Sequence, residues 1–279
     1  MDWWVWPVAL LAVTFAMGVV GVLAGVGGGV LFVPMVGAFF PFHLDFVRAA
    51  GLLLALSASL SAAPALLRSG LASVRLALPL TLVSSLTSIA GALLGLALPT
   101  DKLQMALGLI VLGIAALMWR SRGAEHPEVA RADPLGVALG MHGVYHDATL
   151  GRDVEWRVHR TPAGFLAFAG IGVIAGMFGL GAGWANVPAL NLLMGVPLKL
   201  AVGTSGFLLI GGASSASWIY LERGAVLPML VVPSIIGAML GAKLGVRLLR
   251  AARPAVVRRV VLTLLVLAGA RALLKGFGV

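Results

Sequence analysis

Long runs without Lys, Arg, Asp or Glu dominate the chain, and short charged segments separate them. These uncharged runs are 3–44, 49–67, 76–100, 103–119, 161–198, 200–221, 224–242 and 260–270. A membrane-spanning helix needs about 20 consecutive, predominantly apolar residues. Six of the runs therefore suit one helix each, the last of them only if the flanking arginines extend toward the membrane surface.

Two of the runs, 3–44 and 161–198, are too long for one ordinary pass. Each has room for a helix, a turn and a returning segment. The returning segments would be 30–42 and 184–196, whose length favours half-helices. The pattern thus predicts an all-α polytopic membrane protein with a broken, glycine-rich helical hairpin near the start of each half.

The segment 121–160 is rich in charge and differs from the rest of the chain. Residues 154–158 alternate between apolar and polar, which predicts a short strand, and 147–152 could form the turn of a hairpin. We expect a first transmembrane repeat at 1–120, a solvent-exposed insertion with a β-hairpin at 121–160, and a second repeat at 161–279.

The two long uncharged runs share a motif at an offset of 154 residues. Gly25-Val26-Gly27-Gly28-Gly29 followed by Pro34 matches Gly179-Leu180-Gly181-Ala182-Gly183 followed by Pro188. Gly18 matches Gly172 at the same offset, while Gly91 and Gly95 match Gly237 and Gly241 at an offset of 146. Internal repeats of this kind are typical of secondary transporters.

Composition and charge agree with a membrane protein. Of the 279 residues, 60% are apolar and 11% are charged, and mean hydropathy is +1.05, which nearly excludes a soluble enzyme. The net charge of +10 fits cytoplasmic loops rich in Lys and Arg better than nucleic-acid binding.

The distribution of Lys and Arg along the chain also predicts its membrane topology. If each glycine motif reverses the chain and the N-terminus is external, 15 of the 20 Lys and Arg lie inside. The 5 outside are Arg48, Lys102, Arg223, Arg271 and Lys275. This split follows the positive-inside rule, so we expect inverted repeats, external termini and a cytoplasmic insertion.

A glycine turn at membrane depth must line a cavity or be buried in protein. A half-helix starting after it points free N–H groups and a positive dipole end at the turn, which favours an anion. The alternative is that the glycines only permit close helix packing. The candidate substrate-binding residues are Gly27, Gly28, Gly29, Pro34, Gly181, Ala182, Gly183, Trp184, Asn186, Asn191, Thr204 and Ser205.

No cofactor and no metal are expected. His142 and His146 stand four apart, a metal-binding spacing on a helix, but Gly143 and the following turn argue against a helix there. The chain has neither a Walker motif nor the spacing of a nucleophile elbow, which argues against an ATP-driven pump and against an intramembrane protease. Asn186 and Asn191 could alternatively bond between helices rather than contact substrate.

The motifs resemble those of the TauE/SafE family of sulfite exporters. The resemblance rests on 25–34, on Gly176 to Asn191 and on Ala201-Val202-Gly203-Thr204-Ser205, and it covers nearly the whole chain. The segment from Met141 to Val158 is similar to one seen in a subset of that family. The resemblance implies a polytopic carrier for sulfite, organosulfonates or related small anions. The chain departs from the pattern in that Ala182 replaces a glycine and 48–51 differs from 202–205.

These features predict a secondary transporter in the inner (plasma) membrane, most simply an exporter of small sulfur-containing anions. A carrier for an organic carboxylate and a membrane-embedded sensor or scaffold are the alternatives. The expected partners are a small anionic substrate and the lipid bilayer but no nucleic acid, and self-association into a homo-oligomer is left open. No enzymatic activity is expected.

Overall fold

The computed structural model describes residues 4–24, 29–68, 70–120, 127, 129, 132–147, 151–248 and 254–277. The first half folds into α1 (Val5–Ala24), α2 (Gly29–Phe39), α3 (Leu44–Arg68), α4 (Val74–Ala97) and α5 (Thr100–Arg120). The second half folds into α7 (Thr161–Phe178), α8 (Gly183–Pro188), a π-helical turn (Ala189–Leu193), α9 (Leu198–Glu222), α10 (Pro228–Leu248) and α11 (Pro254–Gly276). The expected all-α polytopic architecture is confirmed.

Both long uncharged runs contain the predicted break. In the first run α1 is followed by α2, which has 11 residues, and in the second run α7 is followed by α8 and the π-helical turn. At about 1.5 Å per residue, an 11-residue helix covers about 16 Å, roughly half of a bilayer core. The returning segments are therefore half-helices, as their length predicted.

Among the described residues, five helices are long and apolar enough to cross a membrane, namely Leu44–Arg68, Val74–Ala97, Thr100–Leu117, Thr161–Phe178 and Leu198–Glu222. Val5–Gly21 and Pro228–Leu244 are shorter apolar helices. α3 begins before the uncharged run that predicted it, so its start includes Asp45 and Arg48.

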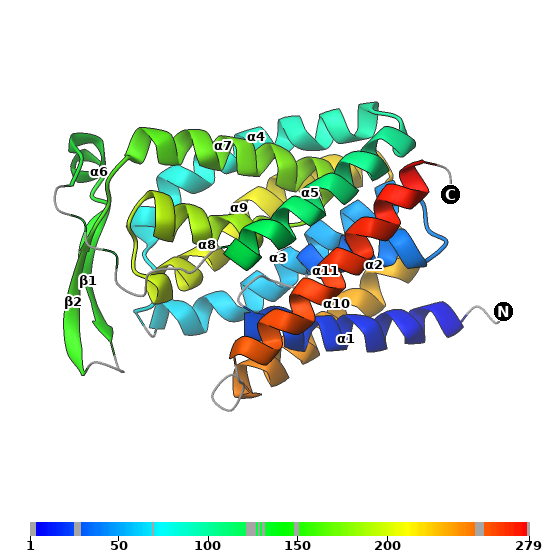
Figure 1. Cartoon of the computed structure of the whole chain (residues 1–279), viewed down its shortest axis with the longest axis horizontal. Helices are drawn as coiled ribbons and strands as arrows, with labels where there is room; N and C mark the ends of the chain where they lie inside the picture. The colour runs from blue at the N-terminus through cyan, green and yellow to red at the C-terminus, as the bar shows by residue number, and fades with distance from the viewer. Residues whose placement is uncertain are drawn as a thin grey trace.

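Helix pairs drawn from opposite halves form the bundle. α1 packs on α10, α4 on α7, α3 on α9 and α5 on α11 (Figure 1). Glycines allow the first two pairs to approach closely: a Cβ at Gly91 would lie 2.1 Å from the Val173 carbonyl oxygen, and one at Gly241 would lie 2.1 Å from that of Phe15. Gly237 and Gly241, four residues apart on α10, form a packing seam against α1.

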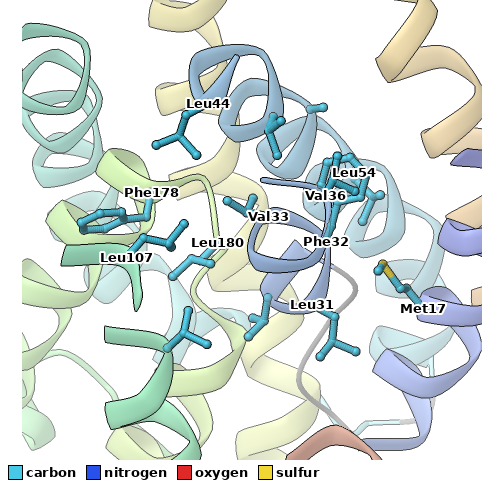
Figure 2. Packing of buried hydrophobic residues seen from close by; sticks show 14 of the residues in the cluster. Met17, Leu31, Phe32, Val33, Val36, Leu44, Leu54, Leu107, Phe178 and Leu180 are labelled. Atoms are coloured by element: carbon cyan, nitrogen blue, oxygen red, sulfur yellow. The ribbon is translucent and has the colours of Figure 1, made fainter. Parts of the chain in front are cut away.

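The half-helix α2 lies in the hydrophobic core. All but two of its 11 residues are buried. Figure 2 shows Val33 of α2 near Leu107 of α5 and near Phe178 and Leu180 from the end of α7, and all four belong to one buried cluster. The core is therefore shared by the two halves and surrounds α2.

The insertion contains α6 (Pro134–Ala138) and an antiparallel hairpin of β1 (His142–Asp147) and β2 (Arg152–Arg157). The hairpin was predicted; its strands pair from His142 with Arg157 to Asp147 with Arg152, while 148–150 lie outside the described residues. Figure 1 places α6 and the hairpin at one end of the bundle and the start of α1 and the end of α11 at the other.

Candidate functional site

The start of α2 lies against the turn that follows α7. Gly27 and Gly28 are outside the described residues, but Gly29 opens α2 and is buried. A Cβ at Gly29 would lie 3.0 Å from the carbonyl oxygen of Leu180 and 3.1 Å from that of Gly51. The folded chain thus joins the glycine motifs of both halves beside α3.

The second break is a left-handed turn enclosed by protein. Gly179 ends α7 with φ 67°, and Gly181 has the same φ, a conformation that favours glycine. A Cβ at Gly181 would lie 3.1 Å from that of Ala55 and 3.3 Å from a methyl carbon of Leu209. The turn therefore lies between α3 and α9, away from lipid, as irregular backbone at membrane depth requires.

Asn186 is the polar side chain that this turn presents without a partner. It lies one turn into α8, which begins at Gly183 directly after Ala182, and it is 1% exposed. Neither its amide nitrogen nor its amide oxygen has a hydrogen-bond partner among the described residues, and the indole nitrogen of Trp184 also has none. Leaving a buried amide unpaired costs about 1–3 kcal/mol. A polar ligand at this place would recover that cost.

Other candidate residues hold the surrounding loops. The Asn191 amide nitrogen donates to the carbonyl oxygen of Val196 at 2.9 Å, which closes the end of the returning segment. The Thr204 hydroxyl accepts from the backbone N–H of Ser73 at 3.1 Å and so ties α9 to the start of α4. Ser205 is buried on α9 and Pro34 is buried within α2. A substrate contact for these four remains a prediction.

The far end of α2 is held by donors from two other helices. The Gln104 side-chain amide of α5 and the Lys275 ammonium of α11 donate to the Gly37 carbonyl oxygen at 3.2 and 2.9 Å. Cationic and N–H groups at a helix C-terminus satisfy free carbonyls and oppose the negative end of the dipole. These contacts fix the orientation of α2, and its other end points toward the breaks.

Arg48 is a buried cation that sequence reasoning placed in an external loop. It is the fifth residue of α3 and has 0% exposure. One guanidinium nitrogen, Nη1, donates to the Met177 carbonyl oxygen at 2.8 Å, and Nη2 pairs with the Asp45 carboxylate. The guanidinium carbon lies 5.6 Å from the centre of the Tyr220 ring. Arg48 is therefore a buried cation next to the turn that follows α7, which the uncharged runs did not indicate.

The insertion carries two histidines four residues apart, and they lie on a strand and not on a helix, as Gly143 and the following turn indicated. His142 and His146 lie on β1, and the His146 imidazole is 2.8 Å from the Asp153 carboxylate, with both side chains exposed. Within the described ranges no group of three or more metal-ligating side chains occurs.

Comparison with known proteins identifies the family. The family model described as "Sulfite exporter TauE/SafE" matches residues 10–272. The chain belongs to the TauE/SafE family. It is also 30% identical over 106 residues to the "Probable membrane transporter protein YunE" of Bacillus subtilis (strain 168).

That match covers 38% of this chain and 39% of the relative, so the chain spans well under half of the relative's length in the alignment. No solved structure matches the chain. Family membership and the polytopic helical fold together support a membrane transporter.

Proposed function

We propose that the chain is a secondary transporter that exports small sulfur-containing anions such as sulfite or organosulfonates. The observation that carries this proposal is the buried, unpartnered amide of Asn186 beside the paired helix breaks. Its N–H groups, the indole N–H of Trp184 and backbone N–H groups after a break are donors suited to an oxyanion. The family name supports sulfur oxyanions as the class.

The fold supports a two-sided carrier built from inverted repeats. Each half supplies one break, and the matched glycines Gly91 and Gly237 lie in corresponding seams, α4 with α7 and α10 with α1. The first half starts at the end of the bundle opposite the insertion, and the second half starts beside the insertion (Figure 1). We place the protein in the inner membrane with the insertion in the cytoplasm, in line with the split of basic residues.

The test is anion flux by purified protein in liposomes. We expect sulfite or a small sulfonate to cross, and we expect Asn186→Leu to abolish that flux. Gly170→Ala is the control, because a Cβ at Gly170 meets nothing within 4 Å. If only carboxylates cross, the protein is a carboxylate carrier and the proposed substrate class is wrong. If neither class of anion crosses in folded protein, the sensor or scaffold alternative is favoured.

A further inference from the structure

We propose that Arg48 is a second anion-binding group of this transporter and that Asp45 competes with the transported anion for its guanidinium. The inference rests on the proposed anion transport. In this arrangement the ion pair is the barrier between the helix breaks and the end of the bundle at which α1 begins. An anion passes when it takes the place of the Asp45 carboxylate.

The position of Arg48 is the first step. Ala55 contacts Gly181, and Arg48 lies seven residues earlier on α3, about 10 Å away at the rise of an α-helix. Its backbone packs against the turn itself, since a Cβ at Gly179 would lie 2.3 Å from the Arg48 carbonyl oxygen. Arg48 therefore lies between the candidate site and the end of α3 nearest the start of α1 (Figure 1).

The contacts of Arg48 divide into fixed and exchangeable ones. The Met177 carbonyl oxygen and the Tyr220 ring hold the guanidinium, and the Tyr220 hydroxyl donates to the Gly176 carbonyl oxygen at 3.1 Å. Asp45 differs from these partners because its side chain is 29% exposed, whereas that of Arg48 is fully buried. If Asp45 turns toward water, the guanidinium remains in place.

A freed guanidinium suits the proposed substrates. Its planar donor fork binds carboxylates and other oxyanions in the same two-point manner. The Arg48 Nε–H already lacks a hydrogen-bond partner among the described residues, so the present contacts do not exhaust its donors. Sulfite or a sulfonate can therefore take over the oxygen contacts that Asp45 now provides.

The pair is not a requirement of the repeated fold. At the 154-residue offset, Asp45 corresponds to Lys199, Arg48 to Val202 and Tyr220 to Leu66. Val202 is 39% exposed where Arg48 is fully buried. Burying a guanidinium is costly even when it is paired, and ionisable groups inside a membrane usually serve function. A role on one side of the carrier explains why only one half has it.

The test uses opposite effects of two substitutions in one ion pair. Asp45→Asn removes the competing carboxylate, so sulfite and methanesulfonate should bind the purified protein about tenfold more tightly. Arg48→Gln removes the anion-binding group, so both should bind about tenfold more weakly. Glu155→Gln and Arg157→Gln are the matched control, because they break an exposed ion pair of 3.4 Å on β2. Isothermal titration calorimetry measures all four variants.

A purely structural ion pair would respond differently. Substitution of either Asp45 or Arg48 would then weaken anion binding and lower thermal stability. That result overturns the proposal. If Arg48→Gln does not fold, Arg48→Lys takes its place in the test. This variant keeps the positive charge but lacks the planar donor fork, so its anion affinity should be intermediate. Weaker binding in both Asp45→Asn and Arg48→Lys would leave the proposed transport standing while removing this role. No binding of either anion by the unmodified protein would remove both.

Discussion

The effect of substituting Asn186 on thermal stability distinguishes a ligand-binding amide from a structural one. Because both of its amide atoms are buried without partners among the described residues, the apolar substitution Asn186→Leu should leave the midpoint of thermal unfolding unchanged or raise it. The same change should weaken anion binding at least about tenfold, the scale of one lost hydrogen bond to a charged group. Thermal unfolding and calorimetric binding on one preparation measure both.

Asn191 is the control for this prediction. Its amide donates to the Val196 carbonyl oxygen, so Asn191→Leu leaves a buried acceptor unpaired and should destabilise the protein by about 1–3 kcal/mol. If Asn186→Leu lowers stability as much as Asn191→Leu does, Asn186 is a structural residue and its assignment to the anion site is wrong.

Asp133 couples the insertion to the second half through its ionised carboxyl. Burial opposes ionisation, but hydrogen bonds from the backbone N–H groups of Thr161 and Gly136 outweigh it and lower the pKa of the carboxyl. A lowered folded-state pKa gives stability that is complete above the unfolded value of about 3.9 and is lost as pH falls below it. Docking of the insertion should therefore be constant from neutral pH to about 5 and weaken below about 4.

Hydrogen exchange of the peptide from 132 to 141, corrected for intrinsic rates, measures this docking. Asp133→Asn keeps one acceptor for the Gly136 N–H but replaces the oxygen that accepts from the Thr161 N–H by an NH2 group. It should raise exchange at neutral pH, since an unpaired buried donor costs about 1–3 kcal/mol, and it should remove the acid dependence. The same acid dependence in Asp133→Asn as in the unmodified protein would assign it to another group.

At the scale of helices, two corresponding seams should respond alike to a single methyl group. Gly91→Ala and Gly237→Ala place a Cβ 2.1 and 2.4 Å from the carbonyl oxygens of Val173 and Leu11, so each must separate two helix backbones. We expect each to lower the unfolding temperature in detergent by several degrees, about 1–3 kcal/mol of overpacking. Gly170→Ala, in open space on α7, should cause no loss. If none of the three variants lowers the unfolding temperature, the helix pairs tolerate the extra distance between their backbones.

The helices could be predicted because charge marks where a chain leaves the bilayer. The breaks before Gly29 and at Gly181 followed from runs that are too long for one pass and that each carry a glycine motif. Gly179 and Gly181 take the left-handed conformation that favours glycine. The same rule failed for Arg48, since a charged residue near the end of an apolar run is read as a boundary. Contacts from α4, α7 and α9, all distant in sequence, bury it. The unpartnered state of Asn186 is equally invisible in sequence, because it depends on what other helices fail to supply.

At the scale of the whole molecule, the positions of the two chain ends and of the hairpin bear on the orientation in the membrane. The start of α1 and the end of α11 lie at one end of the bundle, and the hairpin lies at the other (Figure 1). The five basic residues assigned outside include Lys102 at the start of α5 and Arg223 at the end of α9, which fall at helix ends away from the hairpin. The basic residues assigned outside thus fall at the end of the bundle opposite the hairpin, and a cytoplasmic hairpin stays a prediction from the positive-inside rule.

Single cysteines test this topology directly, because the chain contains no cysteine of its own. Trp4→Cys, Val144→Cys and Phe277→Cys replace exposed side chains near the start of α1, on β1 and just beyond α11, with exposures of 52%, 59% and 67%. On intact cells, an impermeant thiol reagent should label positions 4 and 277 but not 144, and all three should react after the membrane is opened. Positive residues are retained on the cytoplasmic side during insertion, which is the physical reason for that expectation. Labelling of 144 but not of the other two on intact cells would reverse the orientation while keeping the fold. Labelling of 4 and 277 from opposite sides would contradict the inverted relation of the two halves.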